Sequence, residues 1–153
     1  MYLKWIFKNK EVVELPCYTS PRVQHNFRKK ILQNCKFGGN IGIVKIFAPL
    51  TENPNIPNTP DEDGITPIHW ATIKQYTKIV NILAHLSDDP NSPDKNGKTP
   101  IHEAASRGNS KIVKILAPLT NNPNTPDKNG ITPIHLATEE GHTGIVKILA
   151  EPL

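Results

Sequence analysis

Three histidines in register are the first feature of this sequence that could do chemistry. The segment Thr-Pro-Ile-His at residues 66–69 returns at residues 99–102 and again at residues 132–135. Imidazole is a common ligand of zinc, but all ligands of one ion must lie about 2 Å from it. If each motif starts its own helix, equivalent residues on packed helices are about 8–10 Å apart. We therefore predict no metal site and expect a structural role for the three histidines, His69, His102 and His135.

The two cysteines, Cys17 and Cys35, do not form a catalytic pattern. A nucleophilic cysteine needs a base and an orienting group held close to it, and the repeated sequence supplies no such group. Two cysteines are also too few for a disulfide framework or a structural zinc site, so a reducing compartment is expected. Cys35 aligns with Ala104 and Ala137 of later repeats, which predicts a small buried residue. Cys17 is expected to be a free thiol.

The acidic residues do not form a catalytic or calcium-binding pattern either. Asp61-Glu62-Asp63-Gly64 starts like a calcium-binding loop, but the twelve-residue ligand pattern with its final Glu is absent. The pair Glu139-Glu140 is expected on a solvated helix surface. Glycine-rich nucleotide-binding motifs are absent as well. We predict that the chain is not an enzyme and has no catalytic residues, cofactor or metal.

A repeat of 33 residues must position all of these side chains. Spans 94–117 and 127–150 are identical at 16 of 24 aligned positions, and Ile79-Val80 returns as residues 112–113 and 145–146. Such agreement is internal repetition, which indicates a stacked architecture. The chain has 15 prolines among 153 residues, and they recur at fixed places within the repeat.

Each repeat predicts a turn, two helices and a loop. Asp94 to Gly97 is a turn sequence, because Asn-Gly tolerates positive φ. Thr99 suits a helix N-cap and Pro100 the first helical position. Gly108-Asn109 ends this helix and starts the next. Pro118 lacks an N–H group, so the second helix should end or kink near it.

These motifs resemble the ankyrin-repeat family. The shared pattern is Asp-x-x-Gly-x-Thr-Pro-Ile-His-x-Ala, followed by Gly and then by Ile-Val-x-Ile-Leu. The resemblance implies an all-α solenoid of stacked helix-turn-helix units with hairpin loops. Where the family usually has Gly-Ala-Asp after the second helix, residues 87–91 and 120–124 have other sequences of the same length.

The expected organisation is an N-terminal segment, residues 1–29, followed by a repeat domain, residues 30–153. The repeats run at about 30–60, 61–93, 94–126 and 127–153. The first is degenerate: Lys30 to Gln33 stands in the place of Thr-Pro-Ile-His, Gly39-Asn40 matches Gly108-Asn109, and its loop has three extra residues. For residues 1–29 a helix, a strand and disorder all remain open.

Protein recognition is the function that the resemblance implies, because family members bind protein partners through their turn tips and a concave inner-helix face. The positions that differ between repeats are the candidates. At the turn tips they are Glu62, Asp63, Ile65, Lys95, Asn96, Lys98, Lys128, Asn129 and Ile131. At the first helices they are Trp70, Ile73, Lys74, Glu103, Ser106, Arg107, Leu136, Glu139 and Glu140. Trp70 is either a binding hot spot or a core residue.

Charge leaves an alternative open. The net charge is +4, but residues 1–42 hold eight Lys or Arg against two Asp or Glu, and residues 43–153 hold ten against twelve. The basic segment Arg22 to Lys36 could bind nucleic acid or an anionic membrane, although nucleic acid is disfavoured by the acidic repeats behind it. No apolar stretch is long enough to span a membrane, and an intracellular location, cytoplasmic or nuclear, is expected.

Two further expectations concern the end of the chain and its loops. The last second helix has no following repeat, so the chain is expected to be a fragment of a larger regulatory or adaptor protein, or to self-associate through that uncapped repeat. The resemblance leaves one modification open: family members can be hydroxylated on the loop asparagine that corresponds to Asn91 and Asn124, although the sequence around these residues departs from the family's usual Val-Asn-Ala.

Overall fold

The computed structural model describes residues 6–8, 11–13, 21–48 and 58–150. Near the N-terminus, strands β1 (Ile6–Lys8) and β2 (Glu11–Val13) pair antiparallel, with Ile6 opposite Val13. Of the possibilities open for residues 1–29, the structure therefore shows two short paired strands and, from Pro21 onward, a helix. Cys17 and most of the extended loop of the first repeat lie outside the described residues.

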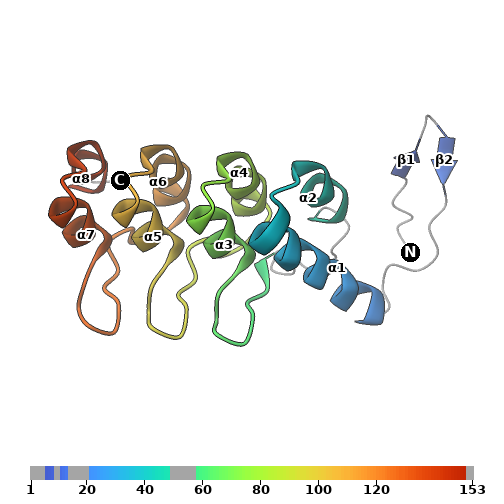
Figure 1. The fold of residues 1–153 in the computed structure, drawn as a ribbon, viewed down its shortest axis with the longest axis horizontal. Coiled ribbons are helices and arrows are strands. Elements are labelled where there is room, and N and C mark those ends of the chain that lie inside the picture. Colours follow the sequence, from blue (N-terminus) through green and yellow to red (C-terminus); the bar gives the residue numbers. More distant parts are fainter. Residues whose placement is uncertain (1–5, 9–10, 14–20, 49–57, 151–153) are drawn as a thin grey trace.

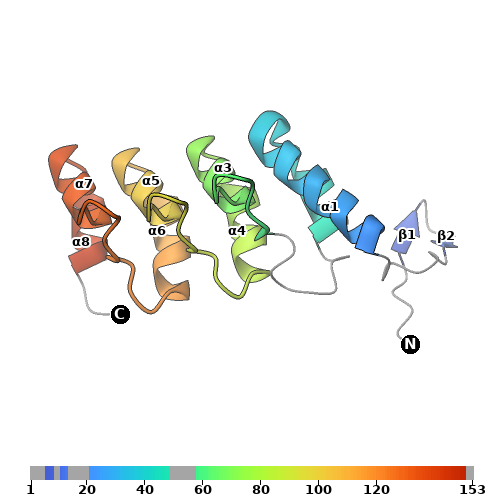
Figure 2. The same ribbon diagram turned by 90° about the horizontal axis from the view of Figure 1, so that it is seen from below.

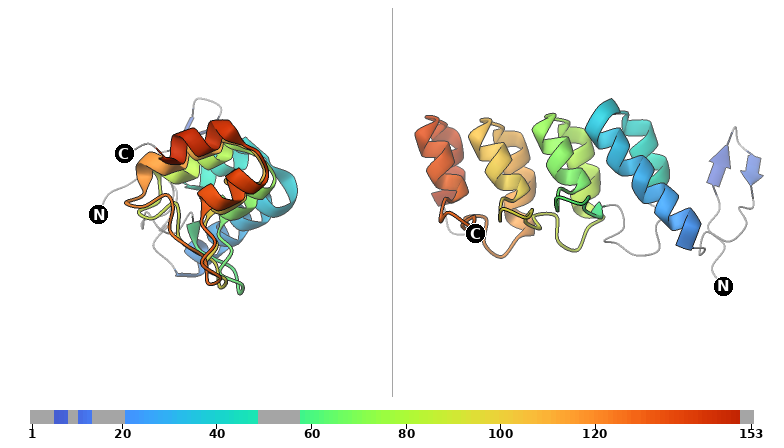
Figure 3. Two further views of the ribbon diagram at one scale, coloured as in Figure 1. Left: turned by 90° about the vertical axis from the view of Figure 1, so that its left-hand side faces the viewer. Right: turned by 60° about the horizontal axis from the view of Figure 1, so that its bottom comes forward.

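The helices form two parallel rows, which confirms the predicted all-α solenoid (Figure 1). The inner row consists of α1 (Pro21–Gln33) with its continuation η1 (Asn34–Gly38), α3 (Pro67–Ile73), α5 (Pro100–Ser106) and α7 (Pro133–Glu139). The outer row consists of α2 (Ile41–Phe47), α4 (Thr77–His85), α6 (Ser110–Leu116) and α8 (Thr143–Ala150). Seen along the stack, the three regular repeats nearly superpose, whereas the helices of the first repeat are offset from them (Figure 3).

Each inner helix of the three regular repeats starts as its sequence predicts. Helices α3, α5 and α7 begin at a proline that follows an extended threonine. The hydroxyl oxygen of Thr66 accepts a hydrogen bond from the backbone N–H of His69 at 3.3 Å. Proline has no N–H to satisfy at this position, and its fixed φ matches the helix. The Thr-Pro pair therefore sets where the inner helices begin.

The outer helices end where their local sequence dictates. Helix α6 stops at Leu116 and passes into the 3-10 turn η4 (Ala117–Leu119), which contains Pro118. This confirms the predicted helix end. In the preceding repeat His85 occupies the place of Pro118, and α4 continues through it as a helix of nine residues. The two helix ends differ because His85, unlike proline, has a backbone N–H to donate and no ring that clashes with the preceding helical turn.

Backbone hydrogen bonds join successive turns. The Oδ1 atom of Asp94 accepts from the N–H groups of Asn96 and Lys98, each at 2.8 Å, and so holds its own turn. The N–H of Lys95 donates to the carbonyl of Asp63 in the turn before, and that of Lys128 donates to the carbonyl of Asn96. The turn tips therefore form one connected edge beside the inner row (Figure 1).

One apolar core runs the length of the stack between the two rows. Ile101 and Ala104 of α5 and Ile112 and Leu116 of α6 are fully buried, and the equivalent residues of neighbouring repeats belong to the same cluster. Alanine on the inner helices lets the rows approach closely. Burying such side chains contributes about 1.5–3 kcal/mol each, so repeat contacts stabilise helices that are too short to persist alone.

The first repeat differs from the sequence prediction at its helix start. Lys30 to Gln33 does not open a helix; it lies inside α1, which begins at Pro21 and lies beside α3 through its C-terminal end (Figure 2). Without a Thr-Pro pair nothing interrupts the helix, and this segment is rich in good helix formers. The predicted boundary at residues 29 and 30 thus falls within a continuous helix, and the division into domains stays a prediction.

Beyond that point the first repeat follows the expected pattern. Helix α1 continues into the π-helical turn η1, which ends at Gly38 and is capped by Gly39. Asn40 then caps α2, its Oδ1 accepting from the N–H of Gly42 at 2.9 Å. This arrangement matches Gly108-Asn109, where Asn109 accepts from the N–H of Ile112. Within the described residues, no helix is long and apolar enough to cross a membrane.

Replacing Gln75 with Gly is expected to stabilise the protein by about 0.5–1 kcal/mol. Gln75 has φ of 60°, in the left-handed region, at a place where the other repeats have Gly39, Gly108 and Gly141. A side chain is strained there, and Gln75 is exposed, so its removal uncovers little apolar surface. Urea unfolding would measure the gain. Gln75→Ala is the matched control and should show no gain, because it keeps Cβ.

Candidate partner-binding surface

The three histidines in register are helix caps, and two of them also join repeats. Nδ1 of His102 accepts from the N–H of Thr99 at 3.0 Å, and Nε2 lies 3.0 Å from the carbonyl of Ile131 in the next turn. His69 makes the same contacts with Thr66 and with the carbonyl of Lys98. The predicted structural role is confirmed for both residues.

Hydrogen bonding fixes the tautomer of these buried rings. A carbonyl oxygen can only accept, so Nε2 of His102 carries a proton and donates it to Ile131. Nδ1 must then be unprotonated, since it accepts from the Thr99 N–H. Burial lowers the pKa of His69 and of His102 below the ordinary value of 6.5. Both rings are thus held neutral, because a proton on Nδ1 would face an N–H donor.

Stability should therefore fall as the solution is acidified. The unfolded chain binds protons at these two rings near pH 6.5, whereas the folded chain resists them. The free energy of unfolding is expected to be constant above about pH 7 and to decrease below about pH 6.5, by at most about 1.4 kcal/mol per pH unit for each ring. Urea midpoints measured across this range would test it.

Titration of Asp127 would also change the free energy of unfolding, but at lower pH than the histidines, so the two effects can be separated. Burial alone would raise the pKa of Asp127, but the N–H groups of Ile131 and Asn129 hold it below its ordinary value. The stability that Asp127 contributes is present above its unfolded pKa, near 4, and is lost only below it. A urea midpoint that does not change between about pH 7.5 and 5 would contradict the histidine prediction.

Cys35 is the buried core residue that its alignment with alanine predicted. Its side chain is fully buried and forms no disulfide. Burial raises the pKa of the thiol to about 12. Because the thiolate is the reactive form, this cysteine is a poor nucleophile at neutral pH.

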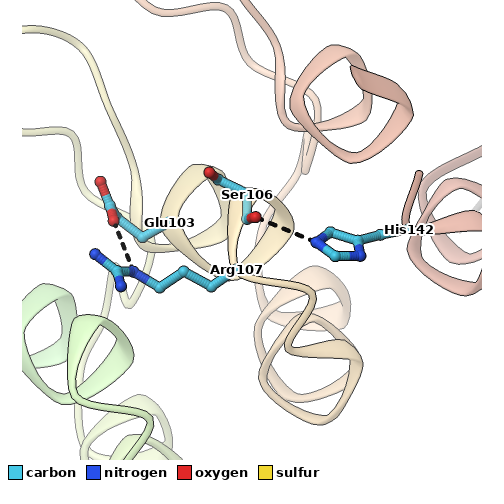
Figure 4. Close-up of polar contacts among 4 residues, drawn as sticks. All are labelled: Glu103, Ser106, Arg107 and His142. Atoms are coloured by element: carbon cyan, nitrogen blue, oxygen red, sulfur yellow. Dashed lines mark hydrogen bonds and ion pairs between the residues drawn. The ribbon is translucent and has the colours of Figure 1, made fainter. Parts of the chain in front are cut away.

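The predicted partner-binding residues lie on the connected turn edge and on the inner row, and none of them is buried. Neighbouring turns bring the turn-tip residues of successive repeats together. On the inner helices, Glu103 and Arg107 form an ion pair at 3.3 Å on one turn of α5 (Figure 4). Nearby, Nε2 of His142 donates to the carbonyl of Ser106 at 3.2 Å, which ties the end of α5 to the start of α8 (Figure 4).

An exposed aromatic cluster occupies the N-terminal end of this surface. Trp70 packs partly against the core, and its Nε1 lies 3.4 Å from Oδ2 of Asp61. The Nζ of Lys36 lies 4.7 Å from the centre of the Trp70 ring and 5.5 Å from that of Phe37. Phe37 is 77% exposed, the most exposed large apolar side chain in the described residues. Trp70 thus combines core packing with an accessible ring.

The comparison of repeats in the sequence did not identify Lys36 and Phe37 as candidate partner-binding residues. With the three extra residues of the first loop taken into account, Phe37 aligns with the predicted residues Ile73, Ser106 and Glu139. That alignment was available from the sequence and would have identified Phe37 as a candidate partner-binding residue. Phe37 also lines a groove of about 580 Å³ together with Ile43 and Phe47, and all the residues that line it belong to the first repeat.

The surface changes chemistry along the stack. Its first half carries the aromatic cluster with Ile73 and Lys74, and its last half carries Leu136 with the exposed carboxylates of Glu139 and Glu140. A partner that follows the inner row therefore meets apolar and basic groups first and acidic groups last. This gradient gives the inner row a direction, whereas the charges of the turn tips run the opposite way, from Glu62 and Asp63 in the first regular turn to Lys128 in the last.

Comparison with known families agrees with this architecture. A family model described as ankyrin repeats (3 copies) matches residues 3–94 and 84–152. The chain belongs to the ankyrin-repeat family. Among curated proteins, none matches the sequence significantly. Ankyrin repeats are generally protein–protein interaction modules and typically lack enzymatic activity.

This ankyrin-repeat chain uses an asparagine to join each loop to the next inner helix. The Oδ1 atoms of Asn58, Asn91 and Asn124 accept from the backbone N–H groups of Ile68, Ile101 and Ile134 at 3.1–3.2 Å. Those N–H groups belong to the first turn of a helix and lack partners within it. The asparagines are therefore structural, and their hydroxylation stays a prediction.

Proposed function

We propose that this ankyrin-repeat chain binds a protein partner through its turn tips and inner-helix row. The observation that carries the proposal is the cluster of exposed Phe37 with half-buried Lys36 and Trp70 at one end of that surface. Aromatic rings of this size are enriched among the residues that dominate binding energy. An exposed phenylalanine ring gains by leaving water when a partner covers it.

The gradient along the inner-helix row supports a partner segment of matching polarity that lies on that row. Lys36 and Lys74 at the first repeats favour acidic or apolar partner groups. Glu139 and Glu140 at the last repeat favour basic ones. Complementary charge mainly sets orientation and the rate of encounter, whereas the aromatic cluster supplies affinity.

Rigid presentation is the proposed mechanism. The turn tips are joined by the backbone hydrogen bonds of Lys95 and Lys128 to the preceding turns. The inner helices are held by caps and a continuous core. A preformed surface loses little conformational entropy on binding. A small number of well-packed contacts can therefore give measurable affinity.

The test compares capture of partners from a lysate of the cells that make this protein. The surface variant combines Phe37→Ala, Lys74→Ala and Arg107→Ala, three exposed positions on successive inner helices. The control variant combines Lys78→Ala, Asn81→Ala and Lys111→Ala, three exposed positions on the outer helices. All six are exposed, so thermal unfolding should confirm that both variants remain folded.

A partner held by the wild type and the control but lost by the surface variant would support the proposal. Partners that both variants hold equally would place binding elsewhere. The alternative, binding of nucleic acid or anionic membrane through the basic segment Arg22 to Lys36, predicts capture that falls steeply with salt. Self-association through the last repeat predicts a mass near twice 17.0 kDa in light scattering.

A further inference from the structure

Charge is segregated between the elements of this protein. Within the described residues, helices α1, η1, α2, α4, α6 and α8 together carry ten Lys or Arg and no Asp or Glu. The turns, loops and inner helices from residue 58 to residue 142 carry five Lys or Arg against ten Asp or Glu. The net charge of the chain therefore does not show that basic residues concentrate on one set of helices and acidic residues on the turns, loops and inner helices after residue 58.

Five exposed lysines mark the outer row. They lie on α2, α4, α6 and α8, which run side by side (Figures 1 and 3). The five are Lys45, Lys78, Lys111, Lys114 and Lys147. We call this set the outer lysine face.

The repeat places these lysines in register. Lys45, Lys114 and Lys147 occupy one repeat position, with Asn81 in the second repeat, and Lys78 and Lys111 share a position one helical turn earlier. Neighbouring helix axes lie about 8–10 Å apart, so the face extends about 30 Å across four helices. Each lysine lies opposite the buried side of its own short helix, as in α6, where Ile112 and Leu116 point into the core.

Among the residues that the structure describes, the helices of the outer lysine face carry no acidic side chain. Within the described residues, the single ion pair joins Arg107 to Glu103 on the inner row. The first acidic residues after α4 are Asp88 and Asp89, in the loop beyond its end. In the part of the chain that the structure describes, no carboxylate lies on these four helices, so the five like charges repel one another and together attract an anionic surface.

We propose that the outer lysine face docks on a bilayer that contains anionic lipids. Lysine side chains are long and flexible, so their ammonium groups can reach the headgroup layer while the helices stay above it. Ile46, next to Lys45, is 55% exposed and supplies an apolar contact at one end of the face. The acidic turn edge, repelled by the same surface, points away and leaves the inner row free for a protein.

A bilayer fits this face better than a nucleic acid does. The exposed residues of α2, α4, α6 and α8 include no Phe, Tyr or Trp on which a base could stack, and the single exposed imidazole, His85, has its Nδ1 engaged with the carbonyl of Asn81. All five cations are lysines, whose ammonium groups act as point charges. None is an arginine, whose guanidinium group can donate two hydrogen bonds to one phosphate. Lipids in a fluid bilayer can move to match lysines about 8–10 Å apart; the phosphates of a strand cannot.

The test uses the full chain and two variants with equal loss of charge. The face variant combines Lys78→Gln, Lys111→Gln, Lys114→Gln and Lys147→Gln. The control combines Lys74→Gln, Lys95→Gln, Lys98→Gln and Lys128→Gln on the turns and inner row. Co-sedimentation would measure binding to phosphatidylcholine vesicles with about 30% phosphatidylserine and to vesicles of phosphatidylcholine alone. Thermal unfolding should show that both variants are folded.

Each lysine near an anionic surface strengthens binding about five-fold. The face variant should therefore lose at least about 100-fold in affinity for the anionic vesicles, and the control less than about three-fold. Wild-type binding should weaken with salt and be absent on phosphatidylcholine alone. The proposal is overturned if the wild type does not bind anionic vesicles at low salt, or if the two variants lose affinity equally.

A second arm separates a bilayer from other polyanions. Binding of a short DNA duplex and of an acidic peptide would be followed by fluorescence anisotropy at the same salt. Tighter binding of either one than of the vesicles, abolished in the face variant, would assign the face to that polyanion and overturn the membrane proposal. Because the inner row is untouched in the face variant, partner capture should persist there whichever result is obtained.

Discussion

Replacing His102 with Ala is expected to destabilise the protein by about 3 kcal/mol. The imidazole of His102 is 1% exposed and lies between two repeats. Its loss leaves the buried N–H of Thr99 without its acceptor at 3.0 Å, and it removes the bond to the carbonyl of Ile131. An unsatisfied buried donor costs about 1–3 kcal/mol, and the vacated volume adds to this.

His135→Ala is the control that the repeat itself provides. His135 caps α7 through Thr132 with the same local contacts, but it is exposed. Water can replace its ring, so only about 1 kcal/mol, the value of a helix cap, should be lost. Urea unfolding of both variants would isolate the inter-repeat contribution. Equal effects for the two variants would show that the histidines act as helix caps alone.

Replacing Gly97 with Ala is expected to destabilise the protein by about 2–3 kcal/mol. Gly97 has φ of 80°, which strains any residue with a Cβ atom. An added Cβ would also lie 3.0 Å from the backbone N of Lys128 and 3.2 Å from the Cα of Asp127. Backbone cannot move aside as a side chain can. The hydrogen bond from Lys128 to Asn96, which joins the two turns, should weaken.

Gly130→Ala separates strain within a turn from contact between turns. Gly130 has φ of 78°, and no atom lies within 4 Å of an added Cβ. Only the cost of the left-handed backbone, about 1 kcal/mol, should remain. Thermal or urea unfolding of the two variants would give the difference. If Gly97→Ala destabilised no more than Gly130→Ala, the turn edge would contribute nothing to the stack.

The regular repeats could be predicted from sequence because their signals are local. Thr99 and Pro100 start a helix through groups within one turn, and Pro118 ends one by lacking an N–H. The burial of Cys35 was predictable for a different reason: repetition aligns it with Ala104 and Ala137, which places it in the same core. Periodicity thus carries tertiary information that a single unit does not.

The first repeat could not be predicted in the same way. Its helix starts at Pro21 and passes through the place of the missing Thr-Pro motif, because only contact with α2 and α3 decides which part of it joins the stack. The cluster of Lys36, Phe37 and Trp70 joins residues far apart in the chain. Its geometry depends on how two unlike repeats meet.

By itself, the sequence determined the repeat length, the turn and helix boundaries of residues 61–150 and the apolar side of each helix. These follow from caps, prolines and periodicity, which act over a few residues. Only the tertiary structure decided which carbonyls His69 and His102 bind in the next turn, that the turn tips form one edge, and that the five lysines in register are all exposed on the outer row. Each of these depends on the spacing and rotation between neighbouring repeats, which side chains from two units set together.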